Sequence, residues 1–156
     1  MTAALYAGRD LNDKSASREL VNEQLWDRLV NRIMLQHDVD RPYAERIMDQ
    51  TFIFLRICAE APGTPYAPSP IVDIGWHTFI LYTREYAQFC QRLAGRFIHH
   101  SPTDDGDNEG SATIADTVAA LKAHGVSVDE SLWFPTDGEN VKPCEAHECR
   151  SFTHGR

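Results

Sequence analysis

The sequence predicts an all-α fold, a compact domain of four helices with an irregular acidic loop and a Cys/His-rich C-terminal tail. Three observations predict it. Apolar residues recur at intervals of three and four, which is the spacing of one helix face. Clusters of proline and glycine separate these segments, and no segment shows the alternation typical of a half-buried strand. With 156 residues, 42% of them hydrophobic, the chain can bury a core without relying on disulfides.

The first two helices are expected at residues 19–37 and 42–60, where the apolar stripes are clearest. Asp40 stands just before the second of them, where its carboxylate can cap the helix N-terminus. Residues 1–18 are polar and weakly patterned, so we expect them to form a flexible arm.

The third helix is expected to begin at Ser69-Pro70, a capping serine followed by proline in the first turn. It should continue to Leu93, with Gly95 as its stop. Its apolar residues lie on most sides, so we expect it to be the central helix, covered by the others. These residues are Ile71, Val72, Ile74, Trp76, Phe79, Ile80, Leu81, Tyr82, Tyr86, Phe89 and Leu93.

A fourth helix is expected from Thr113 to His124, with Thr113 and Asp116 at capping-box spacing and Gly125 at the C-terminal end. The acidic segment before it, residues 103–110, does not match the calcium-binding pattern of an EF-hand, so we expect a solvated loop. Residues 126–134 should pack back through Leu132, Trp133 and Phe134. The helical domain then covers residues 19–134, and residues 135–156 form the tail.

The charge balance is acidic, with 23 Asp and Glu against 15 Lys and Arg and a net charge of −8. Such a chain repels the phosphate backbone, and it carries no basic stripe, so nucleic acid is not an expected partner. Apolar runs are too short to cross a membrane, and the first ten residues hold no apolar block typical of a secretory signal. We therefore expect a cytoplasmic protein. There is no P-loop and no Gly-x-Gly-x-x-Gly motif to indicate nucleotide binding.

Asp73 and His77 are the first candidate site residues. They are four positions apart on the expected third helix, so their side chains share a face. A histidine in such an apolar helix is often a core residue hydrogen-bonded to a neighbour, and Asp73 is the obvious neighbour. The alternative is that His77 ligates a metal ion and Asp73 acts beside it.

His99 and His100 form the second group. Adjacent side chains point in different directions, so at most one of the two is expected to join a given site. In a continuous third helix, His77 and Leu93 lie roughly 24 Å apart. Residues 95–100 must then double back in extended form to reach His77, so a shared site is geometrically strained.

The tail supplies the third group, with two cysteines and two histidines within eleven residues: Cys144, His147, Cys149 and His154. Thiolate and imidazole are the ligands that zinc prefers. The alternatives are an unstructured polar tail with two free thiols, or a disulfide, which a reducing compartment disfavours. The other cysteines, Cys58 and Cys90, lie on apolar helix faces and are expected in the core.

The motif Asp73-x-x-Trp76-His77, within Ile71–Leu81, resembles the glycine-rich domain-containing protein-like family. The resemblance extends over about residues 70 to 102 through Thr83, Tyr86, Phe89-Cys90, Gly95 and Phe97-Ile98-His99-His100. It implies that Asp73, Trp76, His77, His99 and His100 belong to the family's signature. Phe79 stands where larger plant members carry a second histidine, and the long glycine-rich region is absent. The Cys-containing tail is similar to that of short bacterial relatives. The resemblance implies no particular activity.

The leading hypothesis is a small metal-binding protein. Its site is built from His77, one of His99 or His100, and tail ligands from Cys144, His147 and Cys149. The mixed ligands favour zinc, and iron is the alternative if the Asp73 carboxylate ligates. A metal with an open position can activate water, with Asp73 as a catalytic base, and a closed one is structural. Asp73 can also orient His77 from outside the ligand set.

The competing hypothesis is a metal-free interaction module with a disordered tail. Trp76 and His77 then serve packing, and an apolar groove accepts a protein or peptide partner. The sequence leaves open whether the protein is an enzyme, because no nucleophile and base pair is recognisable in it.

Overall fold

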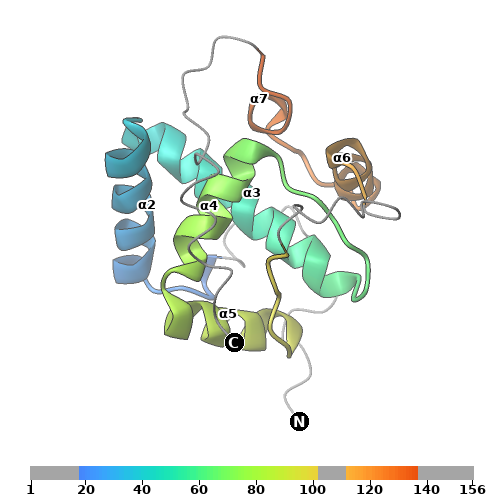
Figure 1. The fold of residues 1–156 in the computed structure, drawn as a ribbon, viewed down its shortest axis with the longest axis horizontal. Coiled ribbons are helices and arrows are strands. Elements are labelled where there is room, and N and C mark those ends of the chain that lie inside the picture. Colours follow the sequence, from blue (N-terminus) through green and yellow to red (C-terminus); the bar gives the residue numbers. More distant parts are fainter. Residues whose placement is uncertain (1–17, 102–111, 137–156) are drawn as a thin grey trace.

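The computed structural model describes residues 18–101 and 112–136, and all regular secondary structure in these two ranges is helical (Figure 1). The all-α class predicted from the sequence is confirmed. The described helices are α2 (Glu23–His37), α3 (Arg41–Glu60), α4 (Pro70–Ile80), α5 (Thr83–Ala94), α6 (Ile114–Ala123) and α7 (Glu130–Trp133). None of them is both long enough and apolar enough to cross a membrane.

Side-chain caps set the starts of α2 and α3. Asn22 accepts a 2.8 Å hydrogen bond from the backbone N–H of Leu25, so α2 begins at Glu23 and not at Glu19. The predicted cap Asp40 accepts a 2.9 Å bond from the N–H of Tyr43 and is confirmed.

The expected third helix is two helices, and this prediction was wrong in its length. Helix α4 ends at Ile80, and Tyr82, with φ −87° and ψ 67°, turns the chain into α5. The break brings Phe79 against Tyr86 and Phe89, with ring centroids 5.2 and 5.0 Å apart. In a straight helix those pairs would be separated by roughly 10 and 15 Å along the axis. Because the helix is divided here, the apolar residues of both α4 and α5 can face the core.

Helices α3 and α4 approach closely at Gly75. A Cβ atom there would lie 2.0 Å from Oγ1 of Thr51, so only glycine fits between the two helices without a shift. The Thr51 hydroxyl donates a 2.8 Å hydrogen bond to the carbonyl of Ile47 and lies 3.1 Å from the carbonyl oxygen of Val72 on α4. This contact fixes the height and rotation of α4 against α3.

The aromatic core lies between α2, α3, α4 and α5. The ring of Phe52 is its centre, with centroids 5.8 Å from Trp26, 5.9 Å from Phe79 and 5.3 Å from Phe89. Cys90 is fully buried, as predicted, whereas Cys58 is only partly buried.

Helix α6 begins with the predicted capping box, in which Thr113 and Asp116 exchange side-chain and backbone hydrogen bonds. The chain then returns to the core through α7. Trp133 is buried, and its indole N–H donates a 2.8 Å bond to Oε1 of the buried Gln50. Phe134 is 46% exposed, so the expectation that it packs inward was wrong. Phe134 follows the last residue of α7, and its φ of −130° and ψ of 69° lie outside the helical range.

Candidate metal centre

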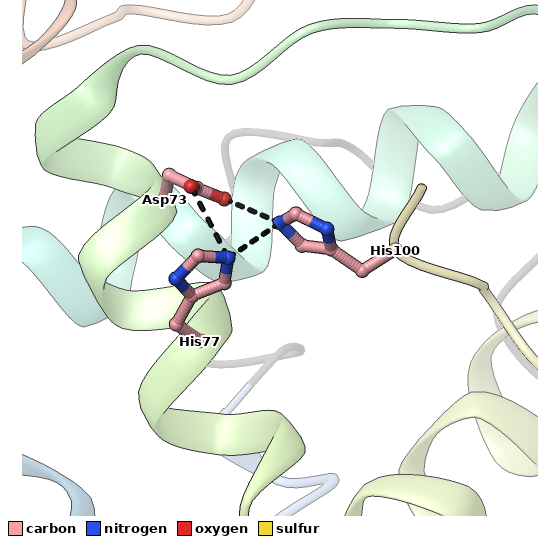
Figure 2. A group of neighbouring side chains, drawn as sticks. All are labelled: Asp73, His77 and His100. Carbon is pink, nitrogen blue, oxygen red and sulfur yellow. Dashed lines mark hydrogen bonds and ion pairs between the residues drawn. The ribbon is translucent and has the colours of Figure 1, made fainter. Parts of the chain in front are cut away.

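Three polar side chains meet at one point on α4. Asp73 and His77 lie one turn apart on this helix, and His100 reaches them from the segment that follows α5 (Figure 2). Nε2 of His100 is 2.8 Å from Oδ1 of Asp73 and 2.8 Å from Nε2 of His77. Nε2 of His77 is 3.3 Å from Oδ2 of Asp73. Both imidazoles and the carboxylate therefore direct their ligand atoms at the same small volume.

The N-terminus of α4 positions the first two residues. Ser69 caps the helix by accepting a 3.1 Å hydrogen bond from the N–H of Val72, and its hydroxyl donates a 2.6 Å bond to the carbonyl of Leu132. The four-residue spacing then places Asp73 and His77 on one helix face. Ser69 therefore both caps α4 and links the N-terminus of this helix to α7.

Three contacts place His100. Helix α5 ends at Gly95 in the left-handed conformation, with φ 67°, and the chain turns back toward α4. Arg96 donates a 2.8 Å hydrogen bond to the carbonyl of Cys58, and Tyr86 donates a 2.6 Å bond to the carbonyl of Ile98. The His100 ring then packs on Trp76, with centroids 4.3 Å apart.

The strain expected for a shared histidine site does not arise. That expectation assumed a continuous helix from Ser69-Pro70 to Leu93, and the break at Tyr82 removes the long return path. His100 is the member of the adjacent pair that joins His77. His99 is exposed and packs its ring on Phe97, with centroids 4.8 Å apart.

Hydrogen bonds alone do not satisfy this triangle while Asp73 is ionised. An imidazole Nε2 carries at most one hydrogen in any charge state. If both Nε2–H groups donate to Asp73, the two nitrogens face each other at 2.8 Å with no acceptor between them. If one nitrogen donates to the other, the accepting imidazole has no hydrogen there for Asp73. A cation held by the three ligand atoms would account for every contact, and this group of side chains could hold one.

Burial favours the ligand form of His77. Desolvation lowers the pKa of this imidazole below its usual value, the Asp73 carboxylate partly opposes the shift, and His100 adds to it. The neutral ring presents a lone pair, which is the form that binds metals.

The spacing of the three ligand atoms is slightly tighter than that of a tetrahedral metal site. Four ligands at 2.0–2.1 Å in a tetrahedron stand roughly 3.3 Å from one another. The contacts of 2.8, 2.8 and 3.3 Å need outward shifts of about half an ångström to match. The side chains of Asp73, His77 and His100 are 27%, 25% and 23% exposed, so the cluster opens to solvent on one side. Among the described residues, this is the group of His, Cys, Asp and Glu side chains that could hold an ion.

Cys58 and Cys90 do not extend this cluster. Burial raises the pKa of the Cys58 thiol to about 12 and also raises the pKa of Cys90, so both are protonated at neutral pH. The tail ligands predicted from the sequence, Cys144, His147 and Cys149 together with His154, lie outside the described residues.

Sequence reasoning missed the part that Tyr86 takes in this site. In the sequence, Tyr86 was one of many apolar positions on the expected central helix. A tyrosine at a buried position is nevertheless a signal, because its hydroxyl needs a hydrogen-bond partner that phenylalanine would not.

The described part of the chain is all-α and carries a cluster of two histidines and one carboxylate that could hold a metal ion. The chain belongs to the UCP032817-like family, whose model matches residues 17–114 and thus includes Asp73, His77 and His100. The resemblance to the glycine-rich domain-containing protein-like family was therefore wrong, since the match over these 98 residues is to a different family. No curated protein and no solved structure matches the chain.

Proposed function

We propose that this protein binds one divalent transition-metal ion through Asp73, His77 and His100. The observation that supports this proposal is the triangle formed by the ligand atoms of these three side chains. While Asp73 is ionised, hydrogen bonds cannot account for all three contacts at once. The lowered pKa of His77 supports the same proposal, because a neutral imidazole needs to lose no proton before it binds.

Zinc is the proposed ion, and ferrous iron is the alternative. Two histidines and a carboxylate form the ligand set of several zinc hydrolases, and the same set with open positions also serves non-haem iron. Zinc takes precedence because the sequence also carries two cysteines, Cys144 and Cys149, and thiolate ligands favour zinc.

Three core ligands leave a further coordination position, for which water and a tail ligand compete. A tail thiolate from Cys144 or Cys149, or the imidazole of His147, would close the site and make the ion structural. Water at that position would have its pKa lowered to about 7, and metal-assisted hydrolysis would then be the reaction class to test. In this proposal Asp73 is a ligand and not the catalytic base.

The test is the metal content and zinc affinity of protein without a histidine tag. We expect one zinc ion per chain in the wild type, measured by elemental analysis and by competition with a chromophoric chelator. His77→Ala should lose the ion while its metal-free form keeps a cooperative thermal melt. If His77 serves packing alone, the substitution should leave zinc affinity unchanged and destabilise the metal-free fold by about 2–4 kcal/mol. That result, or a wild type that takes up no zinc or iron, would favour the metal-free interaction module.

A further inference from the structure

A buried hydroxyl joins the two chain segments that carry the ligands. The indole N–H of Trp76 on α4 donates a 2.9 Å hydrogen bond to Oη of Tyr86 on α5. The same hydroxyl donates a 2.6 Å bond to the backbone carbonyl of Ile98. Tyr86 is fully buried, so this chain of two bonds runs without competition from water.

Each end of this chain adjoins a ligand. Trp76 precedes His77, and Ile98 stands two residues before His100. Trp76 contributes a second time, because its ring lies against the His100 imidazole with centroids 4.3 Å apart. The Tyr86 hydroxyl thus connects the helix that holds Asp73 and His77 to the segment that holds His100.

The segment needs such a connection. Residues 97–101 belong to no helix or strand, so no regular backbone ladder fixes His100. Ordering an irregular residue costs backbone conformational entropy. A backbone carbonyl held at Ile98 removes much of the freedom of the segment before any ion arrives.

We infer that Tyr86 is a positioning residue for the metal centre, which holds His100 against Asp73 and His77 through the Trp76–Tyr86–Ile98 hydrogen bonds. The inference rests on the proposed metal-binding function. The Tyr86 hydroxyl, and not its aromatic ring, positions His100. The ring itself packs edge-on against Phe79 and Phe97, with centroid distances of 5.2 Å in both cases.

Tyr86→Phe separates the two roles, since it removes only the hydroxyl. We expect its zinc affinity to fall roughly tenfold, as for loss of an outer partner of a metal ligand. Cobalt(II) bound in place of zinc should show a changed visible spectrum, because its absorption depends on ligand geometry. Trp76→Phe, which removes the donor and keeps a ring beside His100, should change zinc affinity and spectrum in the same direction.

Thr117→Val is the matched control. The Thr117 hydroxyl is buried in α6, accepts a 3.0 Å bond from the N–H of Ala67 and donates a 3.2 Å bond to the carbonyl of Thr113. Its loss should lower the melting temperature by an amount similar to Tyr86→Phe and leave zinc affinity and the cobalt spectrum unchanged. A purely structural Tyr86 hydroxyl predicts that the two variants behave alike.

Imidazole resonances of the metal-free protein keep this inference distinguishable from the metal-binding proposal. Tyr86→Phe should shift the His100 ring signals, which sense the Trp76 ring, and Thr117→Val should not. If the wild type binds no zinc but His100 shifts, the metal function is wrong and the positioning role holds. If Tyr86→Phe matches the wild type in His100 signals and zinc affinity, the positioning role is wrong.

Discussion

Nε2 of His77 and Nε2 of His100 lie 2.8 Å apart, although 23 residues separate them in the sequence. The turn at Tyr82 produces this proximity, because α5 runs in a different direction from α4 (Figure 1) and the chain that follows α5 returns to α4 at His100. The same turn buries the aromatic faces of both helices. Core packing and assembly of the candidate metal centre therefore depend on one irregular position.

His100→Ala and His99→Ala form a matched pair of substitutions at adjacent positions. His100→Ala removes a proposed ligand, and zinc affinity should fall by more than the roughly 10–100-fold typical of an outer-shell loss. His99→Ala removes an exposed ring that packs on Phe97, so zinc affinity should stay unchanged. Chelator competition measures both. Equal losses in the two variants would contradict the assignment of His100.

Gly75→Ala should destabilise the fold by about 1–3 kcal/mol, because the new methyl group overlaps the Thr51 hydroxyl at 2.0 Å. Urea denaturation measures the loss. In the double variant with Thr51→Ala, the closest atom is gone, so part of the stability should return and the two effects should be non-additive. Strict additivity would mean that α3 and α4 do not touch at this point.

Much of the fold was predictable because its signals are local. Capping side chains fixed the expected starts at Asp40 and Thr113, and both caps are present. The break at Tyr82 has no such signal, since neither proline nor glycine stands between Gly75 and Gly95. It arises from tertiary packing, in which a helix apolar on most sides is divided so that both parts bury their faces.

The candidate site was predictable only in part for the same reason. The four-residue spacing of Asp73 and His77 places them together on any helix. Choosing His100 over His99 requires the direction of the returning segment, which the Tyr86 and Arg96 side chains determine through contacts to distant carbonyls. Those contacts cannot be predicted from the spacing of residues in the sequence.

Asp129 should make the stability dependent on acid pH. Two hydrogen bonds from Arg46, of 2.7 and 3.0 Å, lower the pKa of its carboxyl below the usual value, with a further bond from Ser131. A carboxyl with a depressed folded-state pKa stabilises the protein above its unfolded pKa, near 3.9, and the stabilisation disappears as pH falls through the folded value.

Asp129→Asn should therefore cost about 1 kcal/mol in the free energy of unfolding at pH 7, the size expected for a partly exposed charged pair. The difference between variant and wild type should shrink as pH falls through the lowered folded-state pKa of Asp129, where the wild-type carboxyl is protonated as well. Urea denaturation at pH 7 and in acid checks the sign. A difference that grows in acid would contradict the role of the Arg46 pair.

Truncation after Lys142 tests whether the tail supplies the remaining ligand. Zinc affinity should fall but persist, because Asp73, His77 and His100 stay in place. Zinc should raise the melting temperature of the full chain more than that of the truncated one, since tighter binding stabilises the native state by mass action. In the full chain, zinc should protect Cys144 and Cys149 from alkylation, and protection should weaken at low pH as thiolates take up protons.

Cys144→Ser/Cys149→Ser keeps the tail length and serves as the matched variant, with the same loss of affinity expected. If both thiols react freely in the presence of zinc and neither variant changes affinity, the tail contributes no ligand. The fourth position then belongs to water, and the centre is open to substrate.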